Sequence, residues 1–162
     1  MNHATLPEAD AEARAHDDHH DDLRLWLRLL TCTQLIEQRI RSRLRARFAT
    51  TLPRFDLMAQ LERFPEGLKM KELSQRMMVT NGNVTGITDQ LVAEGLVQRH
   101  EVPGDRRAYR VCLTAQGAAA FQSMAREHEQ WIVECFAQLQ EREKTQLYLL
   151  LAKTKQSLRG QA

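Results

Sequence analysis

The chain has 162 residues, a net charge of +2 and 43% hydrophobic residues, which is typical of an ordinary soluble domain. It contains no run of roughly 18 apolar residues, so we expect no membrane-spanning helix and no membrane partner. The three cysteines are widely spaced, which argues against a disulfide framework or paired zinc ligands and favours a reducing cytoplasm.

Residues 1–20 are predicted to be a disordered acidic tail. They carry a net charge of −4, with almost no large apolar side chain to offset the entropy cost of ordering. The His/Asp-rich stretch 16–22 could hold a metal loosely, but a solvated tail leading into an acidic helix start is the favoured interpretation. We therefore predict no metal site and no cofactor.

Residues 21–53 are predicted to form an N-terminal dimerisation helix, helical over 22–47. Apolar side chains recur at helical spacing, and more of them widen the stripe near its start. The stripe consists of Leu25, Leu29, Cys32, Ile36, Ile40 and Leu44. A helix with so wide an apolar surface must bury more than one face, and a second subunit is the natural cover.

Five arginines alternate from Arg39 to Arg47 near the end of this helix. Alternate residues of a helix are about 200° apart, so these side chains cannot share one face. The favoured interpretation is a solubilising helix end that suits the negative dipole terminus. The alternative is contact with DNA phosphate or an anionic ligand. Pro53 is expected to end the region.

Residues 54–113 are predicted to be a winged helix-turn-helix DNA-binding domain. Helices are expected over 54–64 and 68–77, with a turn at 65–67. A tight connection over 78–80 leads to a further helix, which Thr80 or Asn81 can cap. That helix runs to about Glu94, where Gly95 stops it. Two short helices joined in this way match a helix-turn-helix.

The second helix of this motif combines a core stripe with a neutral polar face. Val84, Ile87, Leu91 and Val92 form the stripe. Short polar side chains, which can bond base edges or touch a thymine methyl, occupy the other positions. We predict DNA contacts from Thr80, Asn81, Asn83, Thr85 and Thr88. The alternative interpretation is a plain surface helix with a polar face.

A β-hairpin is expected next, with strands over 96–102 and 108–113 and a turn over 103–107. Its tip presents Arg106 and Arg107, which could enter a minor groove, with Asp105 beside them to orient a guanidinium. The alternative is a solvated tip with a local ion pair. Helix-turn-helix and basic hairpin together predict double-stranded DNA as the partner.

In this segment the chain resembles the MarR-type winged helix-turn-helix regulators. The matching pieces are Leu68-(x4)-Leu73, Thr80-(x3)-Val84-Thr85-(x3)-Asp89-(x)-Leu91, Gly95-Leu96-Val97-(x)-Arg99, Asp105-Arg106-Arg107 and Leu113-Thr114-(x2)-Gly117. The resemblance implies a mainly α fold with a small β-hairpin. It also implies a homodimer whose first helix interlocks with C-terminal dimerisation helices in residues 114–162, the first of which Thr114 can cap. Such a dimer would bind a pseudo-palindromic operator, with recognition helices about 34 Å apart.

The resemblance further implies a repressor released by a small-molecule effector, here an aromatic acid or its CoA thioester. The expected ligand-binding residues are Trp26, Arg28, Cys32 and Ile36. Arg28 would bind a carboxylate or phosphate, and Trp26 would stack on a ring. The alternative is that Trp26 and Ile36 are core residues and Arg28 is solvated. A thiol-based redox sensor at Cys32 is an alternative, disfavoured because a thiol on the apolar stripe is expected to be buried and inert.

Two other classes of protein are weaker fits. The sequence has no glycine-rich phosphate loop and no convincing set of nucleophile, base and orienting group, so we do not expect an enzyme. A winged helix can also serve as a protein-interaction module. Such a module would more often expose apolar anchors where this chain has Asn, Thr and Arg.

Overall fold

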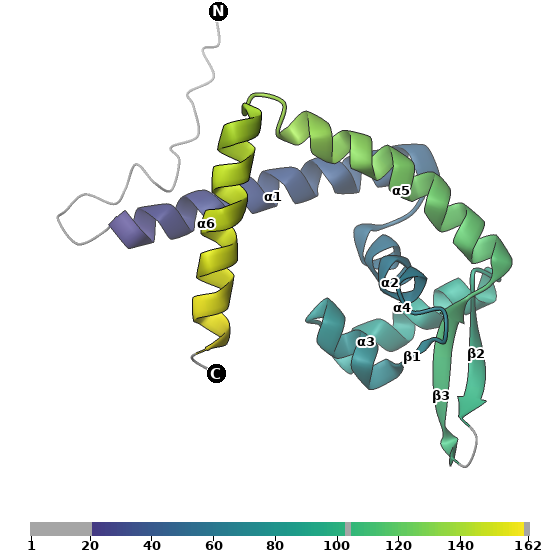
Figure 1. Ribbon diagram of the computed structural model, residues 1–162. Coiled ribbons are helices and arrows are strands. Elements are labelled where there is room, and N and C mark those ends of the chain that lie inside the picture. Colours follow the sequence, from purple (N-terminus) through teal and green to yellow (C-terminus); the bar gives the residue numbers. More distant parts are fainter. Residues whose placement is uncertain (1–20, 103–104, 161–162) are drawn as a thin grey trace, which may run out of the picture.

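The computed structural model describes residues 21–102 and 105–160, which form a mainly helical chain with one small sheet (Figure 1). The elements in order are α1 (Asp21–Phe48), α2 (Leu52–Glu62), β1 (Leu68–Lys69), α3 (Met70–Met77), α4 (Asn81–Ala93), β2 (Val97–Val102), β3 (Asp105–Leu113), α5 (Ala115–Cys135) and α6 (Glu141–Arg159). The predicted fold class is confirmed. Among the described helices, none is long and apolar enough to cross a membrane. The tail predicted for residues 1–20 lies outside the described residues.

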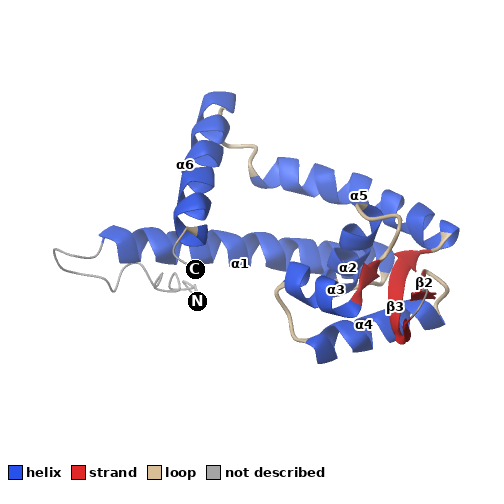
Figure 2. Cartoon of the chain, turned by 60° about the horizontal axis from the view of Figure 1, so that its bottom comes forward, coloured by secondary structure: helices blue, strands red, loops and turns tan. Residues whose placement is uncertain are grey.

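The core lies where α2 packs against α3, α4, α5 and the hairpin. Leu57, Met58 and Leu61 of α2 are fully buried there, together with Leu73 of α3 and Leu91 of α4. The spacing of the three α2 residues places them on one side of the helix, as an amphipathic helix requires. Figure 2 shows the result, with the short helices and the sheet gathered at one end of the long helix α1.

The sheet has three antiparallel strands in the order β1-β3-β2. Leu68 and Lys69 form β1 and do not begin a helix, so the helix predicted over 68–77 starts two residues later than expected. Gly67, at φ +78°, turns the chain so that Leu68 pairs with Val111. Arg110 donates a 2.7 Å hydrogen bond to the Gly67 carbonyl and holds this turn against β3.

The hairpin is tighter than predicted, and it projects beyond the helices in Figure 1. β2 ends at Val102 and pairs there with Asp105, so only residues 103–104 connect the strands. Such two-residue connections match the twist of antiparallel strands. Arg106 and Arg107 therefore belong to β3 and not to a turn, and their side chains lie outside the described part of the structure.

The helix ends follow local rules that the sequence only partly reveals. Pro53 lies in the first turn of α2, where its missing N–H costs nothing, so the expectation that it ends the preceding region is wrong. Thr80 is the N-cap of α4, but its side chain makes no capping hydrogen bond. Thr114 does cap α5, as predicted, because its Oγ1 accepts a 2.9 Å hydrogen bond from the Gly117 amide.

The N-terminal half of α1 and all of α6 pack poorly within one chain. Only Ile40 and Leu44 of α1 are buried, and no residue of α6 is buried. Apolar side chains are exposed on both helices, including Leu25 at 60%, Trp26 at 55% and Tyr148 at 73%. In Figures 1 and 2, α6 stands apart from the winged-helix elements.

Gly117 lies where α5 begins against the turn before β2, and we expect its substitution to disrupt this packing. A Cβ at position 117 would lie 1.8 Å from the Leu96 carbonyl oxygen, whereas one at Gly86 would meet nothing within 4 Å. Gly117→Ala should lower the free energy of unfolding by about 3 kcal/mol or more. Gly86→Ala, the control, should raise it by about 1 kcal/mol because alanine favours helix. Urea denaturation measures both, and equal effects would contradict the close approach.

Candidate nucleic-acid interface

The helix α4 buries one narrow face, which includes a residue predicted to contact DNA. Val84 and Leu91 are fully buried, as predicted, and Thr88 is buried with them at 0% exposure. The Thr88 hydroxyl donates a 2.8 Å hydrogen bond to the Val84 carbonyl, so this polar group has a hydrogen-bond partner although it is buried in the core. Residues four apart share a helix face, so Thr88 follows Val84 inward. The prediction that Thr88 contacts DNA is wrong.

The outward face of α4 carries small and neutral residues. Asn83 and Thr85 are exposed. The flanking glycines Gly82 and Gly86 are exposed too, with open space where a Cβ would stand. The Asn81 side chain lies outside the described residues. The backbone of α4 is therefore accessible along its first turns, between side chains that can donate and accept hydrogen bonds.

Arg99 of β2 connects this helix to the hairpin. It forms an ion pair with Asp89 of α4, and its guanidinium lies 5.1 Å from the ring centroid of Tyr109 on β3. A cation beside an aromatic face adds an attraction to the ion pair. These contacts link the hairpin to α4, so the two predicted DNA-contacting elements are joined through Arg99.

The turn between α3 and α4 contains an exposed residue that the sequence analysis did not single out. Met78 adopts a left-handed conformation at φ 56° and is 91% exposed, and Val79 follows it at 38%. The Val79 amide donates a hydrogen bond to the Ser74 carbonyl at 3.1 Å, which closes the end of α3. No sequence signal marks Met78, since left-handed methionine is uncommon outside such helix ends.

The four predicted ligand-binding residues of α1 line no described cavity in a single chain. Trp26 and Cys32 are exposed, Arg28 is exposed, and Ile36 is half-buried. The expectation that Cys32 is buried is therefore wrong for one subunit. The stripe of α1 joins the core only from Ile36 onward, through Ile40 and Leu44, and the part before it that contains Trp26 and Cys32 stays exposed.

A cavity of about 710 Å³ instead lies between the end of α1, the start of α2 and α4. We call it the arginine cavity. Its lining residues are Arg41, Ser42 and Arg45 of α1, Thr50, Thr51, Leu52, Pro53 and Arg54 around the start of α2, and Val79, Asn83, Ile87 and Gln90 in or just before α4. It includes Asn83 of the predicted DNA face. The four-residue spacing of Arg41 and Arg45 is the signal that could have found it.

The alternating arginines divide between two faces of α1. Arg43 pairs with Glu134 of α5 at 2.6 Å, and Arg47 pairs with Glu127 at 2.9 Å. Arg41 points the other way and pairs with Glu37 at 2.8 Å. The favoured view of this run as a solubilising helix end is therefore incomplete, because the run both ties α1 to α5 and lines the arginine cavity.

Asp56 of α2 is a carboxyl with an altered proton affinity near these arginines. It keeps contact with solvent, but desolvation and repulsion from Glu37 raise its pKa to about 6, against an opposing attraction from Arg41. Within the described residues, no group of three or more His, Cys, Asp or Glu side chains could hold a metal ion.

Comparison with known proteins places this geometry in one family. The MarR family model matches residues 50–109, which run from the start of α2 into the hairpin. An HTH-type transcriptional regulator of Bacillus cereus is 30% identical over 108 residues, covering 66% of this chain and 71% of that protein. The chain belongs to the MarR family. Alignments with other curated relatives span as little as 43% of their length.

Solved MarR structures share the whole described fold. A MarR family transcriptional regulator from Silicibacter pomeroyi is 28% identical, with a TM-score of 0.75, covering 89% of this chain and 99% of that one. A mutant of E. coli MarR, solved in complex with operator DNA, is 24% identical with a TM-score of 0.73, covering 85% and 99%. This MarR protein is thus a DNA-binding transcriptional regulator, and its curated relatives are regulators and not enzymes.

Replacing Asp56 should stabilise the protein in a pH-dependent manner. Because its pKa of about 6 lies above the usual aspartate value of 3.8, ionised Asp56 opposes folding above pH 6, and this penalty fades as the pH falls toward 4. Asp56→Asn should therefore gain more unfolding free energy over wild type at pH 7.5 than at pH 4.5. Burial lowers the pKa of His128, which acts in the opposite direction but cancels in the comparison. Urea denaturation at both pH values tests this, and a constant difference would contradict it.

Proposed function

We propose that this MarR-family protein is a homodimeric repressor that binds a pseudo-palindromic operator and releases it when a small aromatic acid or its CoA thioester binds. The observation that carries the proposal is the exposed, neutral polar face of α4 beside a projecting hairpin. α4 exposes Asn83 and Thr85, and the chain places Arg106 and Arg107 at the start of β3.

The chemistry of these residues supports sequence-specific contact. Asparagine can bond adenine through two hydrogen bonds in the major groove, and threonine can bond a base edge or contact a thymine methyl. We assign these roles to Asn81, Asn83 and Thr85, with Thr80 at the helix start facing phosphate. Arg106 or Arg107 then enters the neighbouring minor groove. A protein of the same fold, the E. coli MarR mutant, has been solved with operator DNA, which supports DNA as the partner of this fold.

The exposed apolar surface supports the dimer. Leu25, Trp26, Tyr148 and Leu158 are all more than half exposed in one chain, and an apolar surface of this extent on two helices is costly in water. A two-fold dimer would cover it with the same surface of a second subunit. We assign Trp26, Cys32 and Ile36 to this contact, which would also withdraw the Cys32 thiol from oxidants.

Selection of bound sequences from a random DNA pool tests the proposal, with the mass of the complex measured by sedimentation. We expect an enriched pseudo-palindrome bound by two chains, with half-sites about one helical turn apart. Recovery of no enriched sequence would overturn it and favour a protein-interaction module.

Asn83→Ala should weaken binding to the selected operator by about 1–3 kcal/mol and weaken binding to random DNA much less, because only the operator presents the matching base. Gln122→Ala, which removes an exposed amide from α5 outside the recognition helix, is the control and should change neither affinity. Titration by fluorescence anisotropy measures both. Equal losses of Asn83→Ala on the two DNAs would make Asn83 a phosphate or stability residue.

Arg107→Ala should weaken operator and random DNA alike and reduce the dependence of affinity on salt. Each lost phosphate contact lowers the slope of log affinity against log salt by about 0.9, so a dimer should lose up to about 2. Arg126→Ala on α5 provides a matched loss of charge away from the hairpin and should leave the slope unchanged. An unchanged slope for Arg107→Ala would remove the hairpin from the contact model.

A further inference from the structure

We propose that Arg54 is a positioning residue, which through its ion pair with Glu94 sets the angle of α4 and thereby the spacing between operator half-sites that the dimer accepts. The inference rests on the proposed function, because it concerns a dimer that binds two half-sites. Arg54 acts on DNA binding only through Glu94, at the end of α4 opposite to the residues assigned to base contacts.

The start of α2 has a fixed direction relative to α1. Ala49 turns the chain in a left-handed conformation at φ 49°. The Ala49 and Thr50 amides donate hydrogen bonds to the Arg45 and Leu44 carbonyls at 3.1 and 3.4 Å, and Leu44 is itself fully buried. Arg54 therefore lies on a segment that follows the orientation of α1, the helix assigned to the dimer contact.

The ion pair joins this start of α2 to the far end of α4. Glu94 is the C-cap of α4, and the Arg54 guanidinium pairs with its carboxylate. A second ion pair, between Asp89 of α4 and Arg99, leads instead to the hairpin, which is the other predicted DNA-contacting element. The Arg54–Glu94 pair is thus the one of these two that lies between the dimerisation region and the recognition helix.

Apolar packing by itself leaves the angle of α4 loosely determined. The arginine cavity, of about 710 Å³, lies along the side of α4 that carries Asn83, Ile87 and Gln90, between this helix and the end of α1. The described side chains therefore leave this junction unfilled. Helices packed through apolar side chains show crossing angles that scatter by about 15–20°, whereas an ion pair holds two particular atoms together.

Arg54 is poorly suited to a role in stability alone. Its side chain is 16% exposed, and its Nε is buried with no hydrogen-bond partner among the described residues. An unsatisfied buried donor lowers stability, and solvent screens the pair because Glu94 is 48% exposed. A buried arginine of this kind adds no more stability than an apolar side chain of similar size, but it can select one arrangement of the elements it joins.

The length of α4 converts a small change of angle into a change of half-site spacing. The helix has 13 residues, so it is about 20 Å long. A tilt of about 10° after release of its far end would move the base-contacting residues by about 3 Å, close to the rise of about 3.4 Å per base pair. Two-fold symmetry applies this shift to both subunits, so the spacing that fits would change by about one or two base pairs.

Affinities of the full chain for a series of operators test the proposal. The series keeps the selected half-sites and lengthens or shortens the spacer between them by one and two base pairs, and fluorescence anisotropy measures each affinity. For wild type we expect a change of one base pair to weaken binding about tenfold or more, because the second recognition helix no longer meets its half-site. For Arg54→Met we expect a loss of about threefold or less, or a shifted optimum, because α4 can tilt.

Arg41→Met is the matched control. It removes an arginine from the same cavity, but the ion pair that it breaks lies within α1 and does not reach α4. This variant should keep the wild-type spacing preference. An equal relaxation in Arg41→Met and Arg54→Met would assign the effect to charge in the cavity and overturn the positioning role.

Glu94→Gln breaks the same pair from the other side and separates geometry from charge. It removes a negative charge, whereas Arg54→Met removes a positive one, so the two variants should change overall DNA affinity in opposite directions. Both should nevertheless relax the spacing preference to the same degree, and the double variant should relax it no further than either single variant. Spacing preferences that change in opposite directions, or additive effects in the double variant, would overturn the proposal.

Urea denaturation distinguishes positioning from a general loss of stability. We expect the unfolding midpoint of Arg54→Met to be unchanged or higher, because the unpaired Nε is removed with the arginine. If this variant fails to fold, the half-exposed Glu94 makes Glu94→Gln the variant that decides. A lower midpoint together with the wild-type spacing preference would make Arg54 a structural residue and overturn the proposal.

Failure of the proposed function has a different signature. If wild type selects no pseudo-palindrome, the dimeric operator model fails, whatever the variants do. If wild type requires one spacing and both variants require the same one, that model stands and only the positioning role of Arg54 is rejected.

Discussion

The burial of one narrow face of α4 determines what this protein can present to DNA. Val84, Thr88 and Leu91 are withdrawn from water completely, and α4 packs through this face against α2 and α3. When one face of a helix is buried, the helical repeat determines which residues lie on the exposed faces. Asn83 and Thr85 are exposed because Val84 between them is not, and the direction of the recognition helix follows from the core.

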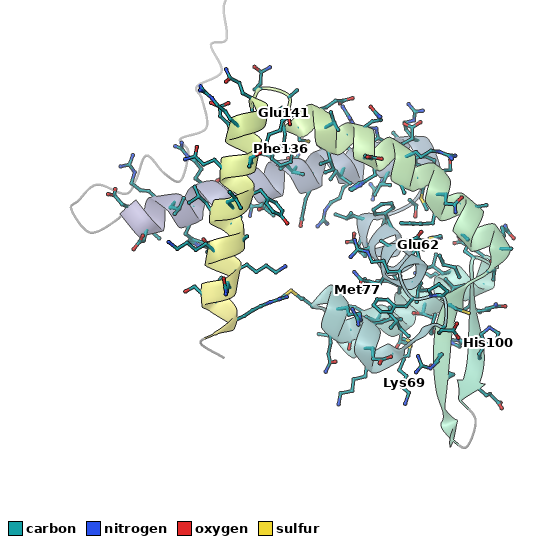
Figure 3. All side chains as sticks on the ribbon, viewed as in Figure 1. Glu62, Lys69, Met77, His100, Phe136 and Glu141 are labelled. Carbon is teal, nitrogen blue, oxygen red and sulfur yellow. The ribbon has the colours of Figure 1, made fainter. Side chains whose placement is uncertain are left out.

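Ion pairs then set how α4 relates to its neighbours. Arg99 joins it to the hairpin through Asp89, and Arg54 joins its end to α2 through Glu94. Both pairs are partly open to solvent, so each adds little to overall stability. Their value lies in orientation, because they connect the DNA-reading helix to two elements that the hydrophobic core alone would leave less strictly placed. Figure 3 shows the side chains of the winged-helix part crowded around these elements, with the helix α6 standing apart from them.

The long helices serve a different purpose from the winged part. The C-terminal half of α1 is bound to α5 through Arg43, Arg47 and the contact between Phe48 and Trp131, whose ring centroids are 6.4 Å apart. Before Ile40, α1 has no buried residue, and α6 has none at all. Because α1 and α6 leave apolar side chains exposed, these two helices offer a surface suited to a second copy of the chain. The arginine cavity lies at the junction between this region and the winged-helix part of the chain.

The sequence by itself determined the kinds of element and their order, because these depend on short-range signals. The spacing of apolar residues predicted the helices, Gly95 predicted the end of α4, and Thr114 predicted the start of α5. It could not determine what depends on residues distant along the chain. Leu68 became a strand only because Val111 was available to pair with it, and Arg106 and Arg107 joined β3 because the hairpin closed in two residues. Thr88 is polar, so the sequence predicts that it is exposed. It is buried in the core, where its hydroxyl donates a hydrogen bond to the Val84 carbonyl. The arginine cavity is likewise a product of tertiary structure, since it exists only where residues of α1, α2 and α4 meet.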